Sequence, residues 1–247
     1  MGSNPREAKN GAHIVRKIAH RGASADFPEN TLAAFEAAIK AGVDMCELDI
    51  QRSADGALVV IHDDTVNRTT DGTGKVGSMT LAELQRLDAG SRRSNDFAGE
   101  KIPTLDEVFD LVDGRCGLNI ELKAHGVEEE VCRIIRERSA ERTAVVSSFE
   151  WDWLMRVKKI APEIRIGVLA DCAPSRMMAA AARLSAWAIH PEAKLVKPEV
   201  CATAHRLGYQ VYTWTVDDRE EMRRLIAVGV DGIMTNYPAR LRSVLES

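Results

Sequence analysis

Short runs of apolar residues alternate along the chain with longer stretches in which apolar residues recur every three or four positions. The short runs fit buried β-strands, and the longer stretches fit amphipathic helices that pack through one face. The predicted strands span Val15–His20, Asp44–Ile50, Gly117–Lys123, Ala144–Phe149, Arg165–Leu169, Ala186–His190, Tyr209–Val216 and Gly232–Asn236. The predicted helices span Thr31–Ala41, Thr104–Val112, Val127–Arg138, Glu150–Ile160, Ser175–Leu184, Pro198–Leu207, Asp217–Val228 and Pro238–Leu245.

Strand-then-helix units that repeat through 247 residues predict an α/β fold in one domain, residues 1–247. This length and rhythm favour a (β/α)₈ TIM barrel. An open, doubly wound sheet stays an alternative, because periodicity does not report closure. Two helix starts have capping-box spacing, Thr104 with Glu107 and Asp217 with Glu220. Asn30 is the expected N-cap of the first helix.

One interval is too short for a parallel crossover, since only twelve residues separate Asp49 from His62. Between them, Asp55-Gly56 is a strong signal for a tight turn. A two-residue hairpin centred there pairs position 54 with 57 and, further out, Asp49 with His62. The turn thus returns His62 beside Asp49, to within about one residue of register.

The segment at about residues 64–101 predicts an insertion into the barrel repeat. Thr65–Gly77 is rich in Thr, Asp and Gly, and Thr80 begins a short helix that ends near Gly90. An insertion of this length on a barrel is often a lid or a rim of the substrate site. A mobile, solvated loop is the alternative.

Charge and composition narrow the class of protein. The net charge is −4 and the basic residues are scattered, so a nucleic-acid partner is not expected. No apolar run reaches the roughly 20 residues of a membrane span. Residues 1–13 are polar and read as a flexible tail without the apolar stretch of a signal peptide, although a removed signal stays open. Five cysteines without zinc-type spacing indicate a cytoplasmic protein with reduced thiols. The oligomeric state stays open, a homo-oligomer included.

Charged and imidazole side chains gather at the ends of the first predicted strands. In a barrel these ends meet at one mouth, and side chains two positions apart share a face. Three carboxylates that converge there repel one another unless a cation neutralises them, and oxygen ligands favour Mg²⁺ or Ca²⁺. The residues are His20, Arg21, Glu47, Asp49, His62, Glu121 and Lys123.

This set of groups suits cleavage of a phosphodiester. A divalent cation with Arg21 and Lys123 stabilises the negative charge that grows on the phosphoryl oxygens. Two imidazoles suit acid/base work, one taking a proton and one delivering a proton to the leaving alkoxide. Either His20 or His62 fits the role of base. Asp63 is expected to orient His62 or the hairpin, and Glu29 is either a helix cap or an outer partner of the metal site.

The chain resembles the glycerophosphodiester phosphodiesterase family through motifs spread from about residue 15 to 240. They are His20-Arg21-Gly22, Pro28-Glu29-Asn30-Thr31, Glu47-Leu48-Asp49, Asp55-Gly56, His62-Asp63, Ile102-Pro103-Thr104-Leu105, Asn119-Ile120-Glu121-Leu122-Lys123, Ser148-Phe149, Trp214-Thr215-Val216 and Gly229-Val230-Asp231-Gly232-Ile233-Met234-Thr235.

The resemblance implies a TIM barrel that hydrolyses glycerophosphodiesters, a small-molecule substrate, to glycerol 3-phosphate and an alcohol. The implied acid/base pair is His20 and His62. The implied metal ligands are Glu47, Asp49 and Glu121. The implied phosphate contacts are Arg21 and Lys123, and the implied apolar substrate wall is Phe149 and Trp214. The hydroxyl next to the phosphoester in such a substrate suggests a cyclic phosphate intermediate.

Other functions stay open on the same residues. A lysophospholipase D or a phosphoinositide-type phospholipase uses a similar barrel and histidine pair. A non-catalytic protein that binds phosphodiesters is the alternative from another class. A sugar-phosphate isomerase or aldolase is a third alternative, and it needs a Schiff-base lysine or an enolisation base. Lys123 is the formal candidate for this group. Such a function leaves the histidine pair without a role.

Overall fold

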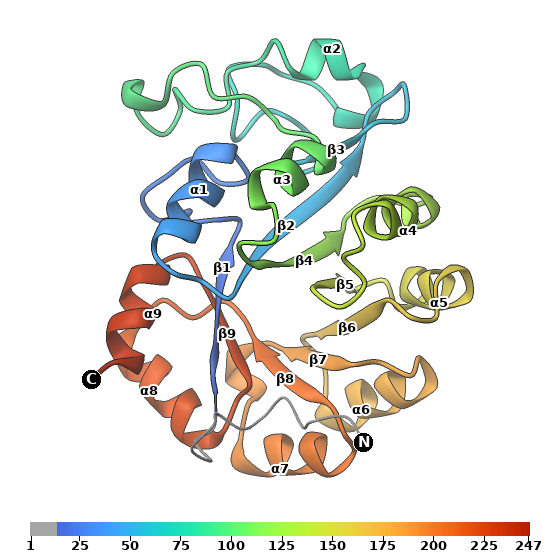
Figure 1. Ribbon diagram of the computed structural model, residues 1–247, viewed down its shortest axis with the longest axis vertical. Coiled ribbons are helices and arrows are strands. Elements are labelled where there is room, and N and C mark those ends of the chain that lie inside the picture. Colours follow the sequence, from blue (N-terminus) through green and yellow to red (C-terminus); the bar gives the residue numbers. More distant parts are fainter. Residues whose placement is uncertain (1–13) are drawn as a thin grey trace.

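The computed structural model describes residues 14–247 and shows a barrel of parallel strands with helices outside it (Figure 1). The barrel strands are β1 (Arg16–His20), β2 (Met45–Arg52), β4 (Gly117–Leu122), β5 (Ala144–Ser148), β6 (Arg165–Ala170), β7 (Ala188–Pro191), β8 (Gln210–Thr213) and β9 (Gly232–Thr235). β1 pairs in parallel with both β2 and β9, which closes the sheet. The predicted TIM barrel is confirmed, and the open sheet is excluded. The tail predicted for residues 1–13 lies outside the described residues.

Helices cover the outer face of the barrel. They are α1 (Leu32–Lys40), α3 (Leu105–Val112), α4 (Glu128–Glu137), α5 (Trp151–Ile160), α6 (Pro174–Arg183), α7 (Pro198–Arg206), α8 (Arg219–Val228) and α9 (Pro238–Leu245), with a 3₁₀ turn at Ala193–Leu195. The outward residues of the strands, such as Leu48, Ile120 and Val146, pack against these helices in one continuous core. Burial of this apolar surface from both sides drives the packing of the two layers.

The inward residues of the strands change character along the barrel axis. At the amino ends they form a separate apolar cluster that includes Ile18, Met45 and Tyr212. Two residues further along the same strands, the inward positions carry His20 and Glu47. Since side chains alternate along a strand, the charged residues share the inward face with this apolar cluster. The barrel therefore has an apolar floor and a charged mouth.

The hairpin after β2 has a register that differs by one residue from the prediction. β3 (Leu58–Val60) runs antiparallel to β2, and Ile61 N donates to Asp49 O at 3.0 Å, so Asp49 faces position 61 rather than His62. The turn has three residues instead of two, because Ser53 N donates to Ala57 O and Gly56 takes a φ of +93°.

The inserted segment lies above β3 and α3 in Figure 1. It contains α2 (Leu81–Leu84) and the 3₁₀ turns Val76–Ser78 and Asn95–Phe97. A small apolar cluster holds it to the barrel, with Val66 and Leu84 packed against residues of β3. The predicted helix from Thr80 to near Gly90 was wrong in its length, because α2 ends at Leu84 and a series of turns follows.

The observed N-caps confirm some of the predicted helix starts and correct others. The capping boxes at Thr104 and Thr80 are confirmed. At α1 and α8 the predicted N-cap lies one residue before the observed one. The N-cap of α1 is Thr31, which leaves Asn30 free to donate to a carboxylate of the barrel. The N-cap of α8 is Asp218, so Asp217 lies outside the helix. It accepts a hydrogen bond from Asn236 at the mouth of the barrel instead. Among residues 14–247, no helix is both long and apolar enough to span a membrane.

Candidate active site

His20 ends β1 and is held by a network from the last strand of the barrel. Its Nδ1 lies 2.7 Å from Asn236 Oδ1. Asp217 accepts hydrogen bonds from both Asn236 N (2.9 Å) and Asn236 Nδ2 (2.7 Å). A carboxylate only accepts, so the amide must present its oxygen to His20. His20 therefore carries its proton on Nδ1, and Nε2 keeps a free lone pair.

Burial lowers the pKa of His20 to about 4, and the neighbouring positive charge of Arg21 adds to this effect. The imidazole is therefore neutral near pH 7. A neutral imidazole with one unprotonated nitrogen is the form that accepts a proton.

The residues after His20 adopt a sharp left-handed turn. Arg21 and Gly22 have φ values of +57° and +81°. A Cβ at Gly22 would lie 2.6 Å from the backbone carbon of Ala34 in α1, so this position requires glycine. The turn points Arg21 N at Glu47 Oε2, which accepts its hydrogen bond at 2.9 Å. The strained backbone at Arg21 thus connects the first and second strands at the mouth.

Three carboxylates from β2 and β4 converge below His20. Glu47, Asp49 and Glu121 are buried, and one oxygen from each lies within 4.8 Å of the others. The register explains the convergence, because Glu47 pairs with Asn119 and Asp49 pairs with Glu121 on adjacent strands. Their inward side chains therefore meet at one level of the barrel.

The carboxylate cluster is poorly compensated by the protein itself. Burial, with the negative charge of Asp49, raises the pKa of Glu121 to about 7. Burial also raises the pKa of Glu47 well above its ordinary value. Within residues 14–247, Glu47 Oε1 and Asp49 Oδ1 are buried and accept no hydrogen bond. Buried carboxylate oxygens that accept no hydrogen bond fit a hard divalent cation.

Two cations border the cluster. Arg21 Nε lies 3.2 Å from Asp49 Oδ2, and Lys123 Nζ forms ion pairs with both Asp49 and Glu121. Arg21 also donates to Glu29 at 2.9 Å. Both predicted phosphate contacts therefore lie at the site, where they bond to carboxylates of the chain.

His62 enters the site from the segment after β3. Its Nδ1 lies 2.7 Å from Asp63 Oδ1, which confirms the expected role of Asp63. Arg68 of the inserted segment donates to Asp63 through Nε at 2.8 Å and lowers the pKa of this carboxyl below its ordinary range. A carboxylate on Nδ1 fixes the ring and stabilises the charged imidazole during proton transfer.

A cavity of about 130 Å³ connects these groups. The ring of Phe149, which follows β5, meets the edge of Trp214 at 5.3 Å and 88° and forms an aromatic wall. Trp214 Nε1 donates to His190 O at 2.7 Å, which fixes the indole. The predicted site residues that line the cavity are His20, Arg21, Glu47, His62, Glu121, Lys123, Phe149 and Trp214. Asp49 lies behind them, fully buried.

Sequence reasoning missed several residues of this site. Asn119 lines the cavity, and the shared face with Glu121, two positions later, was the signal that could have found it. Asn236 and Asp217 hold His20, and Arg68 links His62 to the inserted segment. No local pattern marks these three: Asn236 is 216 positions from His20, and Arg68 also binds Glu29, 39 positions away.

Comparison with known proteins decides the family. Residues 20–240 match the model of the glycerophosphoryl diester phosphodiesterase family. The chain belongs to this family. A glycerophosphodiester phosphodiesterase of Caldanaerobacter subterraneus is 45% identical over 230 residues, which cover 91% of this chain and 95% of that protein. The chain is accordingly a phosphodiesterase.

Solved structures agree with this assignment. The structure of an Oleispira antarctica phosphodiesterase in complex with the product sn-glycerol-3-phosphate is 33% identical, with a TM-score of 0.87 over 95% of this chain and 98% of that one. A glycerophosphodiester phosphodiesterase from Agrobacterium tumefaciens is 32% identical, with a TM-score of 0.86 over 93% and 100% of the two chains. Both structures therefore share this barrel along nearly the whole chain.

Proposed function

We propose that this phosphodiesterase hydrolyses glycerophosphodiesters to sn-glycerol 3-phosphate and an alcohol, with a divalent cation and the pair His20 and His62. One observation carries the proposal. Two imidazoles with different partners share a single cavity with a buried carboxylate trio, in which one oxygen of each residue lacks a hydrogen-bond partner within residues 14–247. The product named in the Oleispira antarctica complex supports the choice of substrate.

The residues Glu47, Asp49 and Glu121 would hold the cation, Mg²⁺ or Ca²⁺. Such an ion supplies charge stabilisation for the phosphoryl oxygens. Arg21 and Lys123 already lie beside the trio, and each can shift a hydrogen bond from a carboxylate to a phosphoryl oxygen.

The hydrogen bonds favour different roles for the two histidines. His20 presents an unprotonated Nε2, so it is suited to take the proton of the attacking hydroxyl. His62 is backed by a carboxylate, so it is suited to carry a proton and give it to the leaving alkoxide. The attacking hydroxyl is water or the 2-hydroxyl of the substrate. Attack by the 2-hydroxyl forms a cyclic phosphate, which water opens with the two histidines in reversed roles.

The test measures release of glycerol 3-phosphate from glycerophosphocholine and glycerophosphoethanolamine. The protein is assayed after chelation and again with Mg²⁺ or Ca²⁺ restored. His62→Ala is compared with His125→Ala, since His125 is exposed, meets Trp153 by its edge and lies 3.5 Å from Arg156 Nη1. We expect release that needs the cation, disappears in His62→Ala and persists in His125→Ala. Release from lysolipids alone would point to the phospholipase D alternative, and no release from either class would contradict the proposal.

A further inference from the structure

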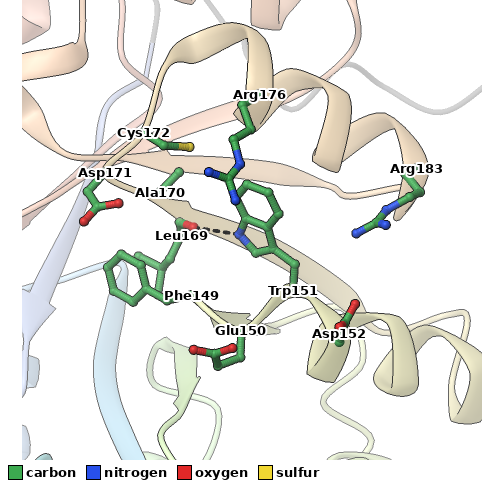
Figure 2. A pocket seen from close by; sticks show the side chains of 10 residues that line it. All are labelled: Phe149, Glu150, Trp151, Asp152, Leu169, Ala170, Asp171, Cys172, Arg176 and Arg183. Carbon is green, nitrogen blue, oxygen red and sulfur yellow. Dashed lines mark hydrogen bonds between the residues drawn. The ribbon is translucent and has the colours of Figure 1, made fainter.

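A second cavity lies directly beside the active-site cavity. Its volume is about 500 Å³, and it shares Phe149 and Leu169 with the site. Figure 2 shows that most of its lining comes from the segments where β5 and β6 end and where α5 and α6 begin, with Arg183 from the end of α6. The second cavity therefore opens at the same mouth of the barrel as the catalytic groups.

The active-site cavity is too small for a whole diester. Its 130 Å³ is well below the roughly 300 Å³ at which pockets for whole small-molecule ligands begin. The phosphate and the glycerol are the parts that must contact the catalytic groups. The alcohol on the other side of the phosphorus needs adjoining space, and the second cavity provides it.

We propose that the second cavity binds the alcohol headgroup, and that the carboxylates of Glu150 and Asp171 select headgroups that carry an ammonium charge. This inference rests on the proposed function and deepens it. It assigns a subsite and two specificity-determining residues that lie outside the catalytic cluster.

Glu150 and Asp171 lie at the end of the second cavity that is nearest to the active site. In Figure 2 both carboxylates are drawn on the same side of the cavity as Phe149. Both residues are exposed, and in residues 14–247 neither carboxylate forms an ion pair or a hydrogen bond with another side chain. Glu150 precedes α5 but makes no side-chain capping bond. Among the described residues these two carboxylates therefore have no side-chain partner, and they are available to a ligand.

The basic residues of the second cavity are placed differently. The guanidinium of Arg176 lies over the ring of Trp151 at 5.4 Å, and Trp151 Nε1 donates to Leu169 O at 3.0 Å. Figure 2 draws both Arg183 and Asp152 on the side of the cavity away from Phe149. The basic residues thus lie over the indole and at the far end, where Asp152 also lies, while Glu150 and Asp171 lie at the near end.

The near end is the part that a short headgroup reaches. In choline and ethanolamine esters the nitrogen is two carbons away from the ester oxygen, so a phosphate held at the catalytic groups keeps the nitrogen close to Phe149. This ring is 39% exposed at the boundary of the two cavities. Lys123 Nζ already lies 5.9 Å from the centroid of this ring, so the carboxylates of Glu150 and Asp171 supply the main attraction for a headgroup ammonium at the near end.

The test compares kcat/KM for glycerophosphocholine and for the neutral-headgroup diester glycerophosphoglycerol. The variants are Glu150→Gln, Asp171→Asn and the double variant, which keep side-chain shape and remove charge. For the double variant we expect kcat/KM to fall about three- to tenfold on the choline diester, as two partly exposed charge contacts are lost. The value for the glycerol diester stays within about twofold. The difference shrinks at high ionic strength, because the contacts are open to solvent.

Asp152→Asn is the matched control, since it removes one negative charge from the far end of the same cavity. It is expected to leave the ratio of kcat/KM for the two diesters unchanged. Equal losses on both diesters, or no loss on the choline diester, would overturn the subsite while leaving the proposed function intact. If the unaltered protein cleaves neither diester with any cation, the proposed function fails and the subsite fails with it.

Discussion

Arg68 in the inserted segment forms two hydrogen bonds with the carboxylate of Glu29, from Nη1 to Oε2 at 2.7 Å and from Nη2 to Oε1 at 2.9 Å. The same guanidinium also bonds to Asp63, which holds His62, while Glu29 also bonds to Arg21. A planar guanidinium fixes both the distance and the angle of the carboxylates that it binds. The inserted segment thereby links His62 to Arg21, the residue that follows β1.

Loss of this link is expected to slow the reaction. Arg68→Met keeps much of the length of the side chain but removes the hydrogen bonds that Arg68 donates to Glu29 and Asp63, so His62 and Arg21 lose their shared support. We expect kcat to fall about ten- to a hundredfold, because small misplacements of catalytic groups are costly. Steady-state kinetics check this result. Arg86→Met, an exposed change in the same segment, serves as the control. Equal kcat values in the two variants would show that Arg68 does not position the site.

The tautomer of His20 is expected to depend on Asp217. Asp217→Asn preserves shape, but the new amide can donate to Asn236, whose own amide is then able to turn its NH₂ toward His20. The proton of His20 then moves to Nε2, and the base is lost. We predict a fall in kcat of about a hundredfold. Asp218→Asn keeps an equivalent N-cap for α8 and is expected to retain activity and stability. An Asp217→Asn variant as active as Asp218→Asn would exclude this role.

The carboxylate cluster predicts a pH-dependent stability in the absence of metal. The pKa of Glu121 rises from an ordinary 4.5 to about 7 on folding, so between these pH values the folded state holds a proton that the unfolded state has lost. This group therefore lowers stability as pH rises, by up to about 1.4 kcal/mol per pH unit in that window. Glu121→Gln removes the titration.

Urea unfolding in a chelator, at pH 5 and pH 7, measures this effect. The stability of Glu121→Gln relative to the unaltered protein is expected to increase from pH 5 to pH 7. Added Mg²⁺ or Ca²⁺ is expected to reverse the difference, because the cation stabilises only the chain that keeps all three carboxylates. Glu199→Gln, at an exposed position of α7, provides the comparison. The prediction fails if the difference between Glu121→Gln and the unaltered protein is the same at both pH values.

Gly22 is expected to be irreplaceable for two separable reasons. Gly22→Ala places a side chain at φ +81° and also brings its Cβ to 2.6 Å from the backbone of Ala34. Gly208→Ala meets only the first problem, with φ +90° and nothing within 4 Å. We expect Gly208→Ala to lower the free energy of unfolding by about 1 kcal/mol. Gly22→Ala should cost roughly 1–3 kcal/mol more, since the backbone of α1 must move. Denaturant unfolding measures both values, and equal losses would contradict the close approach.

Much of the secondary structure follows from local pattern. Apolar runs and helical periodicity place each strand and helix of the barrel to within a few residues, and the capping boxes at Thr80 and Thr104 begin helices as predicted. The caps of α1 and α8 were each missed by one residue, because Asn30 and Asp217 have stronger partners far away in the sequence. The turn at Gly56 took a third residue for a local reason, since Ser53 N donates to Ala57 O and Ser53 Oγ accepts from Ala57 N.

The sequence alone determined the fold class and the residue types at the mouth of the barrel, since alternation along a strand fixes which positions share a face. Only the tertiary structure decided how these residues bond to one another. It set the pairing of His20 with Asn236, the bridge from Arg68 to Glu29, and the cavity beside Phe149. Such contacts join segments up to 216 positions apart, and their geometry depends on barrel closure and on a one-residue choice of register. Local propensity contains no information on either.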